Sequence, residues 1–245
     1  MILDIDAGNS FVKWRLCQGR EALASGSQST GSVLESGLDL TEVETVSAAR
    51  LSSVANNSLT QLLRRQCMDM YSVELQVARV STQVGQVTCG YQQPDRLGID
   101  RWLAVLAAYE KFPQSVLVVD AGSAVTLDLV GPDGQHLGGY IVPGNKLMRE
   151  ALWQGTDGVK VAAVDTHNLM VPGTITEEAV NRGCFLAVIG LIEKLAAQYP
   201  VSLVVTGGDA VALIDALPLK AFHYPDLVLD GLAVRGVEFS SGSCQ

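Results

Sequence analysis

Two segments of this chain share one pattern of apolar and polar residues. LDIDAGNSFVKWRL covers residues 3–16, and LVVDAGSAVTLDLV covers residues 117–130. Each begins with a short apolar run, continues with Asp-Ala-Gly and a small polar residue, and ends in a second run typical of a strand. The pattern predicts two β-hairpins, with Asp6 and Asp120 at the ends of their first strands. The repetition predicts two similar halves, with a site where the two bends face each other.

Elsewhere along the chain, apolar residues at helical spacing indicate amphipathic helices. The predicted helices cover 57–70, 100–112, 147–153, 177–198 and 210–217, and further strands are predicted just before residue 144 and over 201–205. Residues 23–45 are rich in Ser, Gly and Glu and lack clear periodicity, so we expect loop over part of this stretch. The mixture of strands and helices predicts an α/β protein with two halves, residues 1–115 and 116–245.

Composition narrows the class of protein. The 245 residues, 48% of them hydrophobic, suffice for a sizeable core, and the 24 glycines suit tight turns and close backbone–ligand contacts. The formal net charge of -9 argues against a nucleic-acid binder, which needs a basic surface. The five cysteines form no CxxC pair, so neither a zinc site nor a disulfide framework is expected. The chain lacks a basic-apolar leader and a run long enough for a membrane helix, which predicts a cytoplasmic protein without membrane contact.

The two predicted bends carry the groups that ATP chemistry requires. A polyphosphate needs backbone N–H groups that approach it closely and a carboxylate that holds the metal ion or its waters. Gly8 and Gly122 allow close approach because they lack a Cβ atom, while Asp6 and Asp120 supply carboxylates fixed at strand ends. The further polar or flat groups are Asn9, Ser10, Ser123 and the strand-to-helix turn Thr206-Gly207-Gly208-Asp209, which suits the base or ribose of a nucleotide.

Each of these features also has an ordinary structural interpretation. Asp-Ala-Gly is common in plain hairpin turns, and Asp100 suits a helix N-cap. Gly207-Gly208 is compatible with a simple turn, and Lys13 on an outward strand face is a typical solvated charge. The case for phosphate chemistry therefore depends on the features occurring together and in this order.

Six motifs, in this order, resemble those of the type III pantothenate kinases. They are DAGNSFVK (6–13), LGIDRW (97–102), DAGSAVT (120–126), GGYIVPG (138–144), TEEAVNRG (176–183) and TGGDA (206–210). The G-x-D-R and G-G-x-I-x-P-G patterns are fairly specific to that family, whereas the DAG motifs belong to the wider superfamily of actin, Hsp70 and sugar kinases. The chain departs from the family at 155–164, where GTDGVKVAAV replaces the usual T-A-x-L-P stretch.

The resemblance implies two ribonuclease-H-like halves, each a mixed five-stranded sheet flanked by helices, in a homodimer. It implies that ATP phosphorylates pantothenate in the first step of coenzyme A synthesis, with Mg²⁺ and a monovalent cation, K⁺ or NH₄⁺. The implied ATP-binding residues are Asp6, Ala7, Gly8, Asn9, Ser10, Phe11, Val12, Lys13, Ser123, Gly207 and Gly208. The implied substrate-binding residues are Tyr91, Gly98, Ile99, Asp100, Arg101 and Thr176. Asp100 would accept the proton of the substrate hydroxyl, Asp120 would hold the monovalent cation, and Asp6 would help hold Mg²⁺.

Alternatives stay open on the sequence. The first is a regulatory or accessory protein on the same fold that has lost activity, against which the intact Asp6, Asp100, Arg101 and Asp120 argue. The second is another small-molecule kinase or a phosphatase of the superfamily. A sugar site would need more Asn, Asp and Glu side chains for hydroxyl groups than the segment around Tyr91 supplies. A purely structural dimer module would leave the paired acid–glycine bends without a purpose.

Overall fold

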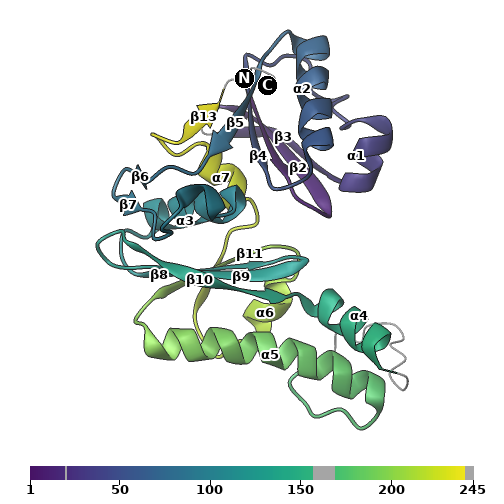
Figure 1. Cartoon of the computed structure of the whole chain (residues 1–245), viewed down its shortest axis with the longest axis vertical. Helices are drawn as coiled ribbons and strands as arrows, with labels where there is room; N and C mark the ends of the chain where they lie inside the picture. The colour runs from purple at the N-terminus through teal and green to yellow at the C-terminus, as the bar shows by residue number, and fades with distance from the viewer. Residues whose placement is uncertain (20, 157–168, 241–245) are drawn as a thin grey trace. The chain divides into compact units, whose positions relative to one another are not determined.

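The computed structural model describes residues 1–19, 21–156 and 169–240. The chain forms two compact units (Figure 1). Unit 1 comprises Met1–Glu110 together with Asp226–Gln245, and unit 2 comprises Lys111–Pro225. Within the described ranges, no helix combines the length and the apolar character that crossing a bilayer requires.

Unit 1 is built on a six-stranded sheet with the strand order β13-β5-β4-β1-β2-β3. The strands are β1 (Ile2–Ala7), β2 (Phe11–Gln18), β3 (Glu21–Ser29), β4 (Ala48–Ser53), β5 (Leu75–Arg79) and β13 (Glu238–Ser240). β1 pairs antiparallel with β2 and parallel with β4. The other elements are α1 (Thr30–Ser36), α2 (Asn57–Tyr71), β6 (Gln83–Val84), β7 (Val87–Thr88), the 3₁₀ turn η1 (Pro94–Arg96), α3 (Ile99–Lys111) and α7 (Leu227–Leu232).

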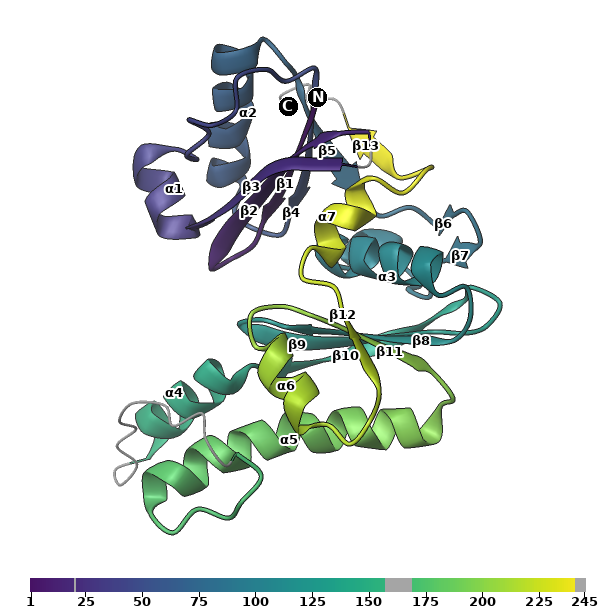
Figure 2. The ribbon, with the colours of Figure 1, turned by 180° about the vertical axis from the view of Figure 1, so that it is seen from behind.

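Alternation along β1 gives this sheet two different faces. Leu3, Ile5 and Ala7 point into an apolar core that buried residues of α1 and α2 complete. Asp4 and Asp6 fall on the opposite face, and α7 contacts β1 and β4 (Figure 2). The hydrophobic core therefore lies on one face of the sheet, while the other face is polar around β1.

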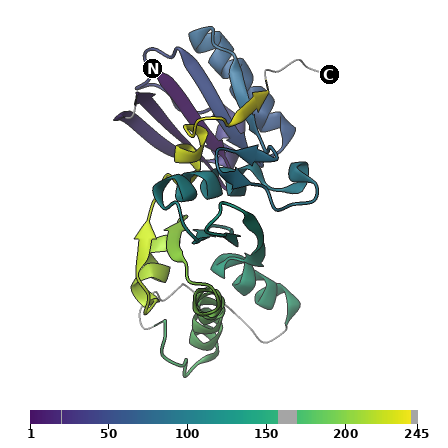
Figure 3. The same ribbon diagram turned by 90° about the vertical axis from the view of Figure 1, so that its left-hand side faces the viewer.

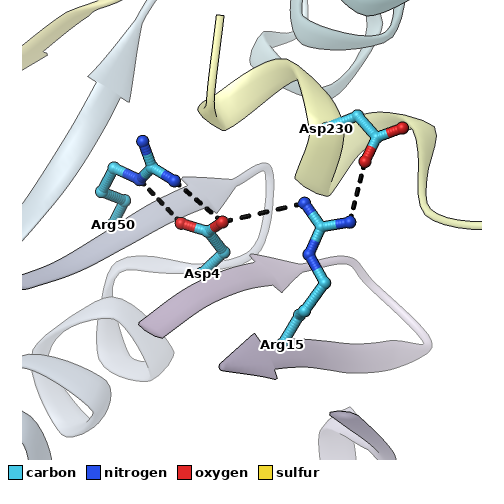
Figure 4. A network of polar contacts seen from close by, with 4 residues as sticks. All are labelled: Asp4, Arg15, Arg50 and Asp230. Carbon is cyan, nitrogen blue, oxygen red and sulfur yellow. Dashed lines mark hydrogen bonds and ion pairs between the residues drawn. The ribbon is translucent and has the colours of Figure 1, made fainter. Parts of the chain in front are cut away.

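The polar face carries a buried ion-pair network (Figure 4). Asp4 is fully buried, and its carboxylate accepts hydrogen bonds from Arg50 Nε at 2.7 Å and Arg50 Nη2 at 2.9 Å. A guanidinium nitrogen of Arg15 lies 3.8 Å from the same carboxylate, and Arg15 donates to Asp230 of α7 at 2.8 Å. Burial raises the pKa of Asp4, while the hydrogen bond from Arg50 and the two arginine charges oppose that rise. The network ties α7 to β1, β2 and β4.

The C-terminal segment belongs to unit 1, whereas the sequence analysis placed it in the half 116–245. β13 pairs antiparallel with β5, with Phe239 opposite Ala78. At Gly231, α7 passes so close to α3 that a Cβ atom would lie 2.3 Å from the carbonyl oxygen of Leu103. The sheet accordingly has six strands where the resemblance implied five, because β13 adds to its edge. A strand of three residues carries too little alternation to be predicted.

Residues 23–45, expected to be partly loop, also contain most of β3 and all of α1. β3 is an edge strand of small and polar residues, each at least partly exposed, which explains the missing periodicity. Gly26 of this strand lies directly over Trp14, since a Cβ atom there would be 2.6 Å from the indole Nε1. Ser29 begins α1 as its N-cap and accepts a hydrogen bond from the N–H of Ser32.

Unit 2 is built on a five-stranded sheet with the strand order β10-β9-β8-β11-β12. The strands are β8 (Val116–Ala121), β9 (Ala124–Val130), β10 (His136–Pro143), β11 (Ser202–Thr206) and β12 (Ala221–His223). The helices are α4 (Asn145–Gly155), α5 (Thr176–Gln198) and α6 (Ala210–Ala216). α5, which Figure 3 shows nearly along its axis, packs Phe185 and Ile189 against Leu117 and Leu127 of the sheet.

The predicted helices are confirmed, with ends that differ by up to two residues. The predictions 57–70, 100–112, 147–153, 177–198 and 210–217 correspond to α2, α3, α4, α5 and α6. The two hairpins are also confirmed, as β1–β2 and β8–β9. Much of the segment 155–164, where the chain departs from the expected motif, lies outside the described residues.

Candidate active site

The bend of the first hairpin presents exposed backbone at the end of two strands. The N–H of Gly8 donates to the Phe11 carbonyl at 3.0 Å and closes the turn. Thr30, the first residue of α1, donates its hydroxyl to the Gly8 carbonyl at 2.9 Å and its N–H to the Ser10 carbonyl at 3.0 Å. Asn9, Ser10 and Phe11 are exposed. The bend is therefore fixed in place and still open to a ligand.

Asp6 lies near the end of β1, just before this bend. In the sheet register it stands between Lys13 of β2 and Ser52 of β4. Register partners on neighbouring strands point to the same side, so these three side chains share the polar face of the sheet. The next row on that face is Asp4 between its two arginines. The first hairpin thus has a carboxylate, an ammonium and a hydroxyl group in one row.

A second group of predicted residues lies at the N-terminus of α3. The carboxylate of Asp100, in the first turn, accepts a hydrogen bond from the N–H of Arg101 at 2.8 Å. Gly98 leaves room for this carboxylate, because a Cβ atom there would lie 2.6 Å from the Asp100 oxygen. Arg101 is 7% exposed and donates to the Tyr91 hydroxyl at 2.9 Å. Its guanidinium carbon also lies 5.7 Å from the centre of the Tyr91 ring. The buried Ile99 completes this turn.

The bend of the second hairpin is closed by backbone contacts. The N–H of Gly122 donates to the Ala124 carbonyl at 3.1 Å, and the N–H of Gly144 donates to the Ser123 carbonyl at 3.0 Å. Gly144, which follows β10, packs so tightly that a Cβ atom would lie 2.4 Å from the Gly122 carbonyl oxygen. Asp120 stands near the end of β8, as Asp6 stands near the end of β1.

The turn after β11 packs on this second bend. Gly207 has a φ of +95°, and a Cβ atom there would lie 2.5 Å from the Ala121 carbonyl oxygen. The N–H of Asp209 donates to the same carbonyl at 3.0 Å. Burial raises the pKa of Asp209, and the charge of Arg149 opposes this rise. Apart from its chain neighbours, no atom of the described residues lies within 4 Å of the Cβ position of Gly208, so this residue borders open space.

A family model described as type III pantothenate kinase matches residues 2–198. The chain belongs to the type III pantothenate kinase family. A type III pantothenate kinase from Ectopseudomonas mendocina is 41% identical over 245 residues, which cover 96% of this chain and 98% of the relative. One from Chromohalobacter salexigens is 38% identical over 248 residues, which cover 95% of this chain and 86% of the relative.

Solved structures agree on the fold. A putative Baf family transcriptional activator from Campylobacter jejuni has a TM-score of 0.65 at 23% identity and covers 94% of this chain, with 95% of its own chain matched. A putative 2-dehydro-3-deoxygalactonokinase from Sinorhizobium meliloti has a TM-score of 0.59 at 12% identity and covers 95% of this chain, with 97% of its own matched. The predicted α/β fold with mixed sheets flanked by helices is confirmed.

The residues predicted from the family resemblance divide between the two units. Unit 1 holds Asp6, Ala7, Gly8, Asn9, Ser10, Phe11, Val12 and Lys13 on its first hairpin, and Tyr91, Gly98, Ile99, Asp100 and Arg101 around the start of α3. Unit 2 holds Asp120, Ser123, Thr176, Gly207 and Gly208. Among the described residues, no group of three or more His, Cys, Asp or Glu side chains is arranged to hold a metal ion.

The described residues line a cavity in each unit, and the cavity in unit 2 includes a predicted site residue. A cavity of about 750 Å³ in unit 2 is lined by Thr176, Met148, Leu152 and other mostly apolar residues of α4 and α5. A cavity of about 850 Å³ in unit 1 lies beside β3, on the sheet face opposite Asp6. It is lined by Trp14 and by residues of α1, α2 and the loop that follows α1. We assign it no role in binding ATP or pantothenate.

Sequence reasoning missed two residues that contact or flank the first hairpin. Thr30 holds the bend, and its only signal was the Ser-Thr pair at the start of a helix. Ser52 stands beside Asp6 in the register, but β4 was not predicted as a strand, so nothing in the sequence placed Ser52 there. Gly144 was part of a quoted motif, yet its contact with the second bend appears only in three dimensions.

Proposed function

We propose that this chain phosphorylates pantothenate with ATP to give ADP and 4′-phosphopantothenate, the first step of coenzyme A biosynthesis. Family membership over residues 2–198 carries this proposal, with a named relative 41% identical over 96% of the chain. The geometry at the start of α3 supports it, because Tyr91, Gly98, Asp100 and Arg101 converge there.

Arg101 is the residue that we assign to the carboxylate of pantothenate. A guanidinium group can pair with a carboxylate through two parallel hydrogen bonds, which fixes the orientation of the substrate. The hydrogen bond to Tyr91 holds the Arg101 side chain, so less conformational entropy is lost when the substrate binds. We also assign Thr176 of unit 2 to pantothenate.

Asp100 is the residue that we assign to the substrate hydroxyl. In the transfer, a bond forms between the hydroxyl oxygen and the γ-phosphorus, and the bond to the β–γ bridging oxygen breaks. ADP leaves with that electron pair, and the hydroxyl proton passes to Asp100. Because the transition state of phosphoryl transfer is loose, orienting the hydroxyl contributes as much as removing its proton. The N-terminus of α3 favours a negatively charged group at this position.

The first hairpin is the part that we assign to the phosphates of ATP. Its exposed bend offers backbone N–H groups, and Lys13 offers a cation in the row of Asp6. ATP serves such kinases as a complex with a divalent metal ion. A single strand-end carboxylate fits Mg²⁺, which typically takes one or two carboxylates together with phosphate oxygens and waters. When bound, Mg²⁺ would neutralise charge on the phosphate oxygens, and Asp6 is the residue that would hold it.

The second hairpin and the turn after β11 are the parts that we assign to the monovalent cation and the nucleoside. Asp120 supplies a carboxylate oxygen, a hard ligand that suits K⁺ or NH₄⁺. The Ser123 hydroxyl would contact ATP. Gly207 and Gly208 present backbone without side chains, and the space beside Gly208 suits the flat face of a base or ribose.

We further propose that the chain acts as a homodimer through unit 2. Large apolar side chains are exposed on and around α4 and the start of α5: Ile141, Leu147, Leu152, Trp153 and Ile175. The apolar cavity that Thr176 lines lies in the same region. Apolar surface of this kind marks a protein interface. We expect Trp153→Asp to convert the dimer to a folded monomer, because this side chain is 58% exposed within one chain. Light scattering coupled to size exclusion would measure the mass, and a monomeric wild type would contradict the proposal.

The central test measures ADP release from Mg-ATP by the pure protein with pantothenate and K⁺. We expect release to require pantothenate and to fall when Na⁺ replaces K⁺. Asp100→Asn should lower kcat about 100-fold or more, in the range usual for a lost proton acceptor. Arg101→Met should mainly raise KM for pantothenate. If the folded protein released no ADP in any mixture, the kinase assignment would be wrong and an accessory role on this fold would be favoured.

A further inference from the structure

Ser52 is a buried polar residue whose hydroxyl group contributes no hydrogen bond to the described part of the fold. Its side chain is 0% exposed, and its Oγ atom has no hydrogen-bond partner within the described residues. Burying a hydroxyl group without a partner is unfavourable, and most buried polar side chains in folded proteins are hydrogen-bonded. The neighbouring Ser53 shows the usual situation, because its hydroxyl lies 3.1 Å from the hydroxyl of Thr60 in α2.

The location of Ser52 indicates a role for its hydroxyl group beside the Asp6 carboxylate. Ser52 and Asp6 are register partners on the parallel strands β4 and β1. Their Cα atoms therefore lie about 5 Å apart, and both side chains point to the polar face. Ser53 points to the opposite face, toward α2. The hydroxyl of Ser52 is thus a hydrogen-bond donor beside the carboxylate that we assign to the metal ion.

The adjacent row of the same face shows why a neutral donor matters here. Asp4 has Arg15 as its partner on β2 and Arg50 as its partner on β4. Arg50 donates two hydrogen bonds to Asp4 and neutralises it. Ser52 occupies the β4 position in the Asp6 row. Lys13 holds the β2 position of that row, so on the β4 side a hydroxyl can orient the carboxylate without adding a second positive charge.

We propose that Ser52 is a positioning residue for the kinase reaction. Its hydroxyl donates a hydrogen bond to the Asp6 carboxylate when Mg-nucleotide is bound and so fixes the orientation of that carboxylate. The proposal rests on the proposed function, and it adds a residue of β4 to the site. Groups that orient a metal-holding carboxylate typically contribute 10–100-fold to metal affinity or activity.

The test compares Ser52→Ala with the matched control Ser53→Ala, one residue away on the opposite face. For Ser52→Ala we expect kcat to fall about tenfold and the Mg²⁺ concentration at half-maximal rate to rise by a similar factor. The KM for pantothenate should stay within about twofold. Calorimetry with ADP and Mg²⁺, without pantothenate, should show weaker metal-dependent nucleotide binding. For Ser53→Ala we expect none of these changes.

Thermal unfolding separates the two roles that a serine can have. Ser52→Ala removes a buried hydroxyl without a partner, so its Tm without ligands should equal or exceed that of the wild type, by up to about 4 °C. Ser53→Ala should lower Tm, because it leaves Thr60 without its partner.

Unchanged kinetics and Mg-ADP binding in Ser52→Ala would overturn the proposal. So would a loss of activity together with a lowered Tm, because the hydroxyl would then serve folding. The outcome is separable from that of the proposed function. A wild type that binds Mg-ADP but does not phosphorylate pantothenate would refute only the substrate, and the binding comparison of the two variants would still decide the role of Ser52.

Discussion

The bends of the two hairpins, at Gly8–Phe11 in unit 1 and Gly122–Ala124 in unit 2, are held in different ways. The first is held by a side chain and an N–H of Thr30, at the start of a helix. The second is held by glycine backbone, with Gly144 and Gly207 in close contact. The two bends therefore tolerate different changes. The first is sensitive to the loss of a hydroxyl group, whereas the second is sensitive to the addition of a single Cβ atom.

The sheets that carry the two bends also differ, in the partners of their buried aspartates. In unit 1, the fully buried Asp4 pairs with Arg50 and Arg15. In unit 2, the buried Asp128 pairs with His136, whose Nε2 lies 2.9 Å from the carboxylate. Arginine keeps its charge under all ordinary conditions, whereas histidine can become neutral. A similar hairpin thus rests on a carboxylate paired with guanidinium groups in one unit and on a carboxylate paired with an imidazole in the other.

The largest expected effect comes from removing the Asp4 carboxylate. Asp4→Asn leaves the mostly buried guanidinium group of Arg50 without its carboxylate, while Arg15 keeps Asp230, and should lower the free energy of unfolding by about 3–5 kcal/mol. The corresponding change Asp128→Asn should cost only about 1 kcal/mol, because a neutral histidine can still hydrogen-bond to an amide. Urea denaturation of both variants measures the difference. Equal losses would show that the two units do not differ in this respect.

A smaller effect is expected from Gly144→Ala. The new Cβ atom would meet the Gly122 and Ser123 carbonyl oxygens at 2.4 and 2.7 Å, so the second bend must move. We expect the free energy of unfolding to fall by about 1–3 kcal/mol and KM for ATP to rise. The control is Gly190→Ala in α5, where the new Cβ atom meets no described residue outside its own helix backbone within 4 Å, and this variant should be as stable as the wild type or slightly more stable. If the Gly144→Ala enzyme were as stable as the wild type, the close packing of Gly144 on the second bend would be contradicted.

The smallest effect is expected from Thr30→Val. This change removes the hydrogen bond from the Thr30 hydroxyl to the Gly8 carbonyl and keeps the shape of the side chain. We expect a loss of about 1 kcal/mol in the free energy of unfolding, together with a higher KM for ATP. Thr30→Ser keeps the hydroxyl and should restore most of the affinity for ATP. If Ser and Val at this position gave the same KM, the hydrogen bond would have no part in holding the bend.

The elements near these bends were predictable where local residues determine them. The strand–Asp-Ala-Gly–strand pattern located both hairpins, and helical spacing located α3, because both signals lie within a few residues. The Asp4 network was not predictable, since Arg50 lies far from Asp4 in the sequence, as Asp230 lies far from Arg15, and these pairs meet only through the fold. β3 was not predicted because an edge strand of mostly small and polar residues, all at least partly exposed, shows no apolar periodicity.

Contacts among the candidate site residues could not be predicted from the sequence either. Tyr91 and Arg101 were expected to serve one substrate, and they do form a hydrogen bond, although neither side chain signals its partner in the sequence. Ser52 could not be found at all, because its position beside Asp6 is a matter of register between two parallel strands. The roles of all these residues in binding and catalysis stay predictions until the kinetic tests are made.

The return of the C-terminal segment to unit 1 has a consequence for protein synthesis. All of Lys111–Pro225 leaves the ribosome as one continuous stretch, so unit 2 is complete before translation ends. Unit 1 must wait for α7 and β13, which are translated after unit 2. Until then its first hairpin lacks the Asp230 partner of Arg15, and its sheet exposes the open edge of β5. A frameshift after the codons for unit 2 would therefore damage unit 1, whose first hairpin is translated long before.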